Sequence, residues 1–192
     1  MIKSRVKKLI LPAALMLLFV CPFIGLLLAN ADEVMSGGGY AVTGQLSETG
    51  YTSVVYDANN GLPTSDANYI YSADDGFMWI GGYSGIFRYD GSVFERLDAT
   101  DGLTSGRVIF EDSSNRIWVG TNDNGVVMLD NGVSTHITYN EGLPSSSIRA
   151  FAEDNDGNII VGSTAGISYI DKDNIVHTID NEELNTKRIV RL

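Results

Sequence analysis

Residues 74–91 read DDGFMWIGGYSGIFRYDG, which places a tryptophan among glycines and then alternates apolar with polar residues. Two runs rich in aromatic and branched residues, FMWIGG at 77–82 and GIFRYD at 85–90, are bounded by turn residues. Short runs of this kind between Asp, Gly and Ser favour β-strands joined by tight turns. The stretch therefore predicts two consecutive strands of an antiparallel sheet.

The same pattern occurs three times along the chain. WIGG at 79–82 is followed by WVGT at 118–121 and IVGS at 160–163, and a Gly-Leu pair recurs at 61–62, 102–103 and 142–143. A third landmark, SGI at 84–86, returns as NGV at 124–126 and AGI at 165–167. The landmarks recur every 39 to 42 residues in the same order. The chain therefore repeats one structural unit.

Each repeat contains four runs typical of short strands. They span 68–73, 77–82, 85–90 and 93–98, then 107–112, 116–121, 125–130 and 133–139, then 147–154, 158–163, 166–171 and 175–180. Four short strands in about 40 residues are typical of one blade of a β-propeller. We therefore expect an all-β fold of β-propeller blades, each a four-stranded antiparallel sheet, preceded by an N-terminal signal or transmembrane helix.

The residues that recur at each landmark have an architectural interpretation. We expect the tryptophans and the isoleucine that replaces them to point between blades, and the glycines of the second strands to let neighbouring blades approach closely. We expect the Gly-Leu pairs to form the crossovers, with each leucine buried beneath. These structural positions are Trp79, Trp118 and Ile160, then Gly81, Gly120 and Gly162, then Gly61, Leu62, Gly102, Leu103, Gly142 and Leu143.

The repeats predict the domain boundaries. Residues 51–60 are expected to form the outer strand of an incomplete unit, and complete blades follow at 61–101, 102–141 and 142–182. Residues 183–192, ending in KRIVRL, look like the start of a fourth blade. Closed propellers need typically four to eight blades. We therefore expect the partial propeller of 51–192 to be the N-terminal part of a longer protein.

The first 31 residues predict export. Four basic residues precede an apolar run from Leu9 to Leu28, and Ala29-Asn30-Ala31 fits a signal-peptidase site. The run is also about long enough to span a bilayer. A cleaved signal peptide and an uncleaved membrane anchor therefore both remain open, and both place Asp32 onward outside the cytoplasm. Residues 32–50 are rich in small and polar residues and predict a flexible linker.

Charge and cysteine content exclude several function classes. Nine of the 13 Lys and Arg follow residue 31, against all 24 Asp and Glu, so the exported part carries a net charge of −15. Such a surface repels nucleic acid, which we do not expect as a partner. The only cysteine, Cys21, lies in the apolar run, so no intrachain disulfide is expected in the exported part.

Catalytic and metal-binding motifs are not found in the sequence. His136 and His177 fall in the outermost strand of their repeats and are interpreted as exposed imidazoles. The run 154–158, DNDGN, lacks the glycine position and closing glutamate of a calcium loop. Residues 72–79 fit the S-x-D-x-G-x-x-W Asp-box of sialidase-type propellers, which is a folding element. We therefore expect no catalytic residue, cofactor or metal in this chain.

The repeat as a whole, with WIGGYSGIFRYDG and WVGTNDNGVVMLDNG as its best matches, resembles the two-component regulator propeller repeat over residues 51–192. The resemblance implies the extracytoplasmic sensor region of a bacterial transmembrane receptor, with small ligands that are often carbohydrates. It also implies a parent protein, expected to be a homodimer, that continues through further blades and a membrane helix to a histidine kinase or diguanylate cyclase. The chain itself is not expected to be an enzyme.

The resemblance implies that a ligand would bind at the loops that join second to third strands and near the starts of first strands. The candidate ligand-binding residues are Tyr83, Ser84, Arg107, Asn122, Asp123, Asn124, Arg149, Thr164 and Ala165. Two alternatives remain open. One is an exported glycan-binding or sialidase-like propeller enzyme, and the other is a protein-interaction propeller with no small-molecule pocket.

Overall fold

The computed structural model describes residues 54–59, 61–64, 66–97, 102–185 and 187–192. The predicted signal or anchor (1–31), the linker (32–50) and the first residues of the predicted outer strand lie outside this described part. Within it, no helix is long and apolar enough to cross a membrane.

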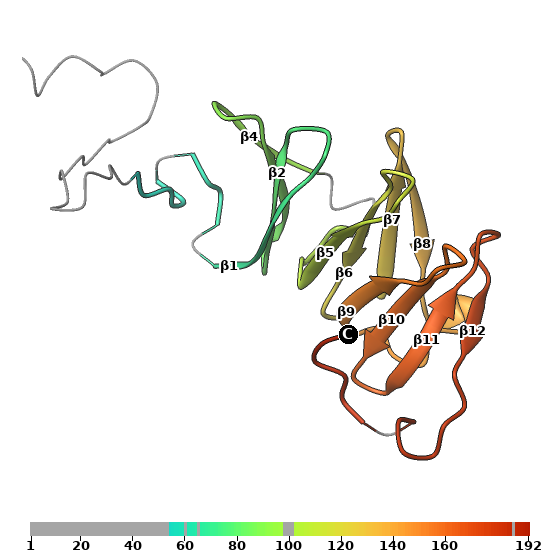
Figure 1. Cartoon of the computed structure of the whole chain (residues 1–192). Coiled ribbons are helices and arrows are strands. Elements are labelled where there is room, and N and C mark those ends of the chain that lie inside the picture. The colour runs from blue at the N-terminus through green and yellow to red at the C-terminus, as the bar shows by residue number, and fades with distance from the viewer. Residues whose placement is uncertain (1–53, 60, 65, 98–101, 186) are drawn as a thin grey trace, which may run out of the picture. The chain divides into compact units, whose positions relative to one another are not determined.

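Twelve strands form three four-stranded antiparallel sheets in chain order (Figure 1). The first sheet contains β1 (Ala67–Ser72), β2 (Met78–Gly82), β3 (Gly85–Tyr89) and β4 (Phe94–Arg96). The second contains β5 (Val108–Glu111), β6 (Ile117–Gly120), β7 (Val126–Asp130) and β8 (Val133–Ile137). The third contains β9 (Ile148–Glu153), β10 (Ile159–Ser163), β11 (Gly166–Ile170) and β12 (Val176–Thr178).

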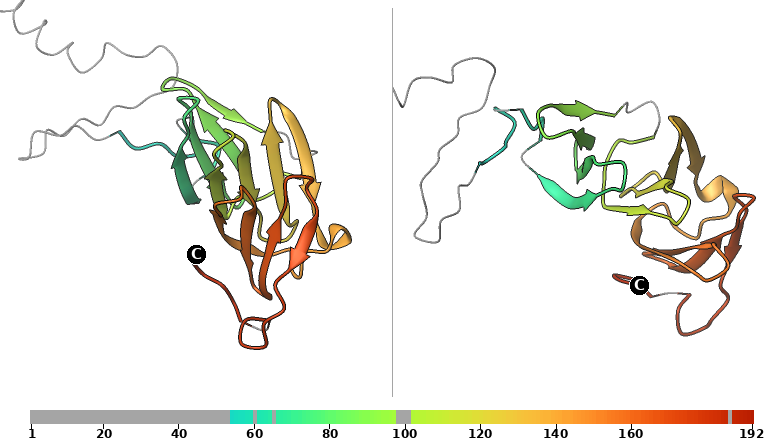
Figure 2. Two further views of the ribbon diagram at one scale, coloured as in Figure 1. Left: turned by 45° about the vertical axis from the view of Figure 1, so that its right-hand side comes forward. Right: turned by 45° about the horizontal axis from the view of Figure 1, so that its top comes forward.

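Every strand pairs with its neighbour in sequence, so each sheet is a meander (Figure 2). This arrangement confirms the predicted all-β fold of four-stranded antiparallel units. The sequence interpretation missed one element, a short 3-10 helix at Tyr139–Glu141 between the second and third sheets. Thr138 caps this helix, and Gly142 ends it with φ 106°, a backbone conformation that favours glycine.

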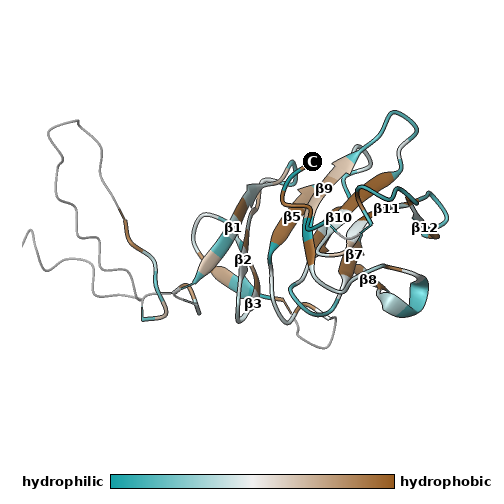
Figure 3. Cartoon of the chain, turned by 90° about the horizontal axis from the view of Figure 1, so that it is seen from below, coloured by the Kyte–Doolittle hydropathy of each residue, from teal (hydrophilic) through white to brown (hydrophobic). Residues whose placement is uncertain are grey.

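The core lies between consecutive sheets. One cluster joins the first sheet to the second, and Trp79, Leu103 and Ile109 are among its members. Another joins the second sheet to the third and includes Trp118 and Ile148. Figure 3 shows hydrophobic residues concentrated on the strands and hydrophilic residues in many of the turns. Each sheet thus buries a face on its neighbour, as blades of a propeller do.

The glycines of the second strands lie where the next unit begins. A Cβ added at Gly120 would approach Cγ1 of Val108 to 2.6 Å and Cγ2 of Ile148 to 2.7 Å. A Cβ at Gly162 would lie 2.7 Å from Cγ2 of Ile189. The backbone N–H groups of Ile148 and Ile189 also donate equivalent hydrogen bonds of 2.9 Å, to the carbonyls of Thr121 and Ser163. Successive units therefore join through the same close backbone approach.

The two predicted partial units differ from complete blades. Residues 54–59 form no strand, although Tyr56 packs on Tyr89 and Phe94 at the edge of the first sheet. Residues 187–192 also form no strand, because their described hydrogen bonds reach only the third sheet and its neighbouring turn. Ile189 nevertheless lies against Gly162 as Ile148 lies against Gly120. That residues 183–192 begin a fourth blade stays a prediction.

Candidate functional site

The meander order brings two kinds of predicted residue to one edge of the sheets. In each sheet the loop between second and third strands lies at the same end as the start of the first strand, because these strands are antiparallel. Gly82 pairs with Ala67 in the first sheet, Gly120 with Val108 in the second, and Ser163 with Ile148 in the third. The candidate loops and arginines therefore share this edge, which we call the loop edge.

Arg149 is the best-positioned candidate on the loop edge. It is the second residue of β9 and is half-buried. Its Nη2 donates to Oγ of Ser147 at 3.0 Å, and its Nη1 lies 3.4 Å from Oδ1 of Asn122. These contacts hold the guanidinium between the loop of the second sheet and the first strand of the third sheet.

Two donors at this contact lack an acceptor. Nε of Arg149 and Nδ2 of Asn122 are buried and make no hydrogen bond within the described residues. A buried donor without a partner is unfavourable by about 1–3 kcal/mol. An acceptor supplied from outside the chain would satisfy these donors.

Further positive charge lies near Arg149. Burial, followed by the charges of Arg107 and Arg188, lowers the pKa of Arg149 below its ordinary value. Among the described residues, none of these three arginines takes part in a salt bridge. A cluster of cations without salt-bridge partners is unusual on a chain whose residues 32–192 carry a net charge of −15. We call these three residues (Arg107, Arg149 and Arg188) the arginine cluster.

The other candidate residues in the loop of the second sheet differ in their hydrogen-bond partners. The backbone N–H of Asn122 donates to Oγ of Ser105, which in turn donates to the exposed Asp123. Asn124 instead supports the crossover, because its Nδ2 donates to the carbonyl of Gly102 at 3.1 Å. Asn122 therefore faces the arginine cluster, whereas the side chain of Asn124 is used within the fold.

The corresponding loops of the first and third sheets contribute fewer residues to the site around Arg149. Tyr83 is 61% exposed, and it lies close enough to Arg149 to affect the pKa of that arginine. The carbonyl of Ser84 accepts a hydrogen bond from Arg96. Thr164 shares a 2.8 Å hydroxyl contact with Ser145, and the N–H of Ala165 donates to Ser163. Thus Tyr83 joins the site, and the groups of Ser84, Thr164 and Ala165 bond to their own surroundings.

Sequence reasoning missed Arg188, Ser147 and Ser105. Arg188 lay inside the run interpreted only as a strand, although its charge and its place at the start of a repeat were visible. Ser147 and Ser105 gave no signal, because serine before a strand is a common turn residue. Their roles depend on contacts with Arg149 and Asn122 that only the fold reveals.

The structural positions predicted from the repeat lie as follows. Leu62, Leu103 and Leu143 are buried, each in a different core cluster. Gly61, Gly102 and Gly142 have positive φ, and Gly81 lies against the backbone of Gly106. Trp79 and Trp118 are buried between sheets, whereas Ile160 is half-buried and lies on the third sheet.

The acidic turns and His177 have local structural roles, whereas His136 is exposed. The carboxylate of Asp154 accepts hydrogen bonds from the backbone N–H groups of Asp156 and Asn158 and from the Asn158 amide. His177 donates to Asp171 at 2.7 Å and stacks on Tyr169. In the part of the chain that the structure describes, no group of three or more His, Cys, Asp and Glu is arranged to hold a metal ion.

The sequence matches the family model described as two component regulator propeller at residues 105–123 and 142–165. These two segments run from the crossover of one unit into its second strand or the loop after it, and they contain much of the loop edge. The chain therefore carries two-component regulator propeller repeats. No curated protein matches the sequence.

Solved structures with the same fold include extracellular domains of one-component and two-component systems. The chain is 24% identical to the extracellular domain of the hybrid two-component system BT3049 of B. thetaiotaomicron, with a TM-score of 0.65 over 73% of this chain. It is 18% identical to that of the one-component system BT4673 from the same organism, with a TM-score of 0.60 over 75% of this chain. The chain spans only 20% and 21% of the lengths of those two domains.

An enzyme shares the fold as well. A catalytically inactive virginiamycin B lyase from Staphylococcus aureus with quinupristin is 17% identical, with a TM-score of 0.58 over 76% of this chain and 50% of the lyase. At these identities the likenesses establish the propeller fold alone. The function must therefore be argued from this chain's own residues.

Proposed function

We propose that this chain is the extracytoplasmic ligand-sensing propeller region of a bacterial transmembrane signalling receptor, and that its ligand carries an acidic group. The propeller repeats, the predicted export segment and the likeness to extracellular domains of signalling systems support the location and the class. The output module, a histidine kinase or a diguanylate cyclase, would belong to the parent protein and not to residues 1–192.

The arginine cluster carries this proposal. Arg149 has a buried Nε–H without an acceptor, and the half-buried Asn122 beside it has a free amide N–H. Arg107 and Arg188 add positive charge to the same place. A carboxylate or sulfate would accept from these donors and offset the repulsion among the guanidinium groups. A small acidic ligand, such as an acidic sugar, fits this chemistry better than a neutral one.

The position of the cluster suggests how binding would be transmitted. Asn122 belongs to the second sheet, Arg149 to the third, and Arg188 to the segment that follows the third. A ligand that contacts all three would favour the arrangement in which these units are closely joined. Sensing requires this differential affinity, since a ligand that binds two arrangements equally shifts neither.

The experiment compares D-glucuronate with D-glucose, which differ in the acidic group, on the purified full chain. Thermal melts should show a concentration-dependent rise in Tm with glucuronate, whereas any rise with glucose should be the same in the wild type and in Arg149→Gln. Arg149→Gln should remove the rise with glucuronate. Lys172→Gln, which removes an exposed cation in the β11–β12 turn at the opposite end of the sheets, is the matched control and should retain it. An equal rise in both variants would contradict the site.

A further inference from the structure

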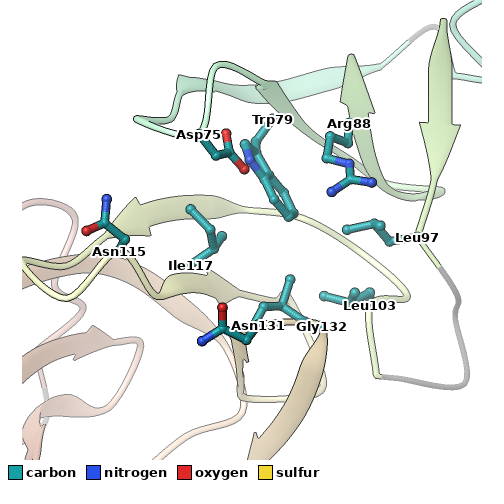
Figure 4. A pocket seen from close by; sticks show the side chains of 10 residues that line it. Asp75, Trp79, Arg88, Leu97, Leu103, Asn115, Ile117, Asn131 and Gly132 are labelled. Atoms are coloured by element: carbon teal, nitrogen blue, oxygen red, sulfur yellow. The ribbon is translucent and has the colours of Figure 1, made fainter. Parts of the chain in front are cut away.

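A pocket lies away from the loop edge, between the first and second sheets (Figure 4). Its volume is about 430 Å³, which is within the usual range of about 300–1,000 Å³ for small-molecule sites. Trp79 and Arg88 line it from the first sheet, and Ile117 and Leu129 line it from the second. Asp75, Asn115 and Asn131 lie at turns around it, at the end of the strands opposite the loop edge.

Between the second and third sheets the equivalent hollow is lined by turn residues such as Ser114, Asp156 and Lys172, and the tryptophan beneath it has its partners within the chain. Trp118 donates its indole N–H to Asp112 at 2.7 Å, and Arg116 holds the same carboxylate at 2.6 Å. The cross-strand partner of Trp118 is Met128, which is buried in the core cluster. Every polar group at this tryptophan therefore has a partner within the chain.

The first sheet has the equivalent tryptophan, Trp79, but different residues stand in the positions of Asp112 and Met128. Ala73 stands in the position of Asp112, with the same backbone bond across the turn, since Ala73 N–H reaches the Phe77 carbonyl as Asp112 N–H reaches that of Arg116. The cross-strand partner of Trp79 is Arg88 in place of a methionine. Because directly paired residues share one face of a sheet, Arg88 and Trp79 both face the second sheet, as Figure 4 shows.

Two donors in this pocket therefore lack an acceptor. The side chain of Trp79 is almost fully buried, and its Nε1 makes no hydrogen bond within the described residues. Nε of Arg88 is also buried and unpaired, although its Nη2 donates to Glu95 at 2.7 Å. A buried Trp N–H usually finds a partner. In the second sheet the equivalent turn supplies such a partner, the carboxylate of Asp112.

Charge and shape restrict the class of ligand. Glu95 neutralises Arg88, and Asp75 adds a carboxylate to the pocket wall beside Trp79, so an acidic ligand would be repelled. The asparagine amides and Asp75 offer acceptors as well as donors. Leu97, Leu103, Ile117 and Leu129 form an apolar wall. Hydroxyl groups around a ring with apolar C–H faces would satisfy this combination of donors, acceptors and apolar surface.

We propose that the pocket between the first and second sheets binds a small neutral polyhydroxylated ring, with Trp79 Nε1 and Arg88 Nε donating to its hydroxyl oxygens. The chain contains two tryptophans, and the second, Trp118, is fully buried and already hydrogen-bonded. Trp118 is therefore an internal reference for any change at Trp79. This site is independent of the arginine cluster and of the sensor function proposed above.

The test follows the two indole N–H signals of the ¹⁵N-labelled full chain by NMR, assigned with Trp79→Phe and Trp118→Phe. The probes are methyl glucoside as the neutral ring, glucuronate as the acidic ring, and acetate as an acid without a ring. Methyl glucoside should shift the Trp79 signal saturably and leave the Trp118 signal in place. The acidic probes should leave both signals in place.

Two variants give Trp79 the kinds of neighbour that Trp118 has in the second sheet. Ala73→Asn supplies an uncharged acceptor for Trp79, and Arg88→Met supplies the residue found opposite Trp118. Each should weaken methyl glucoside binding about tenfold or more, the change that corresponds to losing about one hydrogen bond. Arg149→Gln should bind methyl glucoside as the wild type does. No saturable shift with methyl glucoside, a larger shift with an acidic probe, or unchanged binding in both copied variants would overturn the proposal.

Discussion

Asp112 accepts a 2.7 Å hydrogen bond from the indole nitrogen of Trp118, and its side chain is completely buried. The same carboxylate accepts from the backbone N–H groups of Ser114 and Arg116, and it pairs with the Arg116 guanidinium. One side chain thus closes the β5–β6 turn and orients the tryptophan that packs between the second and third sheets. The first four predictions below concern this tryptophan, its carboxylate and the interface they support.

Asp112→Ala should strongly destabilise the chain. The substitution leaves a partly buried guanidinium, an indole N–H and two turn N–H groups without their acceptor. Breaking a buried ion pair by removing one partner typically lowers the free energy of unfolding by about 3–5 kcal/mol. Urea denaturation followed by tryptophan fluorescence measures this difference. Asp154→Ala, which removes the equivalent but more exposed turn carboxylate, should have a smaller effect; the reverse order would contradict this account.

The two tryptophans should respond differently to phenylalanine. Trp118→Phe leaves Asp112 without one of its donors and should lower the free energy of unfolding by about 1–3 kcal/mol beyond the change in packing. Trp79→Phe removes an N–H that has no partner among the described residues, so this additional loss should be missing. Paired chemical denaturation curves test the difference. Equal losses in the two variants would show that the Asp112 bond contributes nothing.

Stability should fall on acidification. Hydrogen bonds from Asn158 to Asp154 and from His177 to Asp171 lower the pKa of each of these carboxyl groups below its ordinary value. At Asp112 burial opposes the change, but the bonds from Trp118, Arg116 and Ser114 together still lower the pKa. Because these values are depressed in the folded state, their stabilisation is complete above the unfolded pKa and disappears as pH falls through the folded pKa.

The measurement for this pH dependence is the free energy of unfolding across the range below about pH 5. Asp112→Asn keeps the size of the side chain but removes its titration, so its curve should fall less steeply than that of the wild type. An identical slope in the variant and the wild type would contradict a role for Asp112 in the acid limb.

Gly120→Ala should disrupt the interface between successive units. The added methyl group would lie 2.6 Å from Val108 and 2.7 Å from Ile148, both buried side chains. Overpacking of this kind typically lowers the free energy of unfolding by about 1–3 kcal/mol. Gly120 is not among the glycines with positive φ, so this loss reflects overpacking and not backbone strain. If Gly120→Ala is as stable as the wild type, the close approach does not matter for stability.

Much of this fold was predictable because it repeats. Each landmark occurs three times, so a strand that is ambiguous in one unit is clear in another, and all twelve strands fall within the predicted runs or one residue beyond them. The exceptions are at the ends. Residues 54–59 and 187–192 have strand-like composition but form no strand in the structure. Composition alone does not supply the hydrogen-bond partners that a strand requires.

The sites were less predictable because they arise where the repeats differ. Arg149 and Asn122 were recognised from their places in loops and strand starts, but their contact joins residues 27 positions apart. The pocket at Trp79 was missed entirely. In the sequence, the pocket was indicated only by a difference between repeats, because Ala73 and Arg88 of the first unit stand where the second unit has Asp112 and Met128. This difference can be interpreted only when it is known which faces of the two sheets pack against each other.

The central claim is that the arginine cluster binds the acidic group of a ligand, and calorimetric titration tests it most directly. D-glucuronate is titrated into the purified full chain, Arg149→Gln and Lys172→Gln. The account predicts saturable binding to the wild type and to Lys172→Gln, and binding at least about tenfold weaker to Arg149→Gln, since a hydrogen bond to a charged group contributes about 1.5–3 kcal/mol. Equal affinity for glucuronate in the wild type and Arg149→Gln would contradict it.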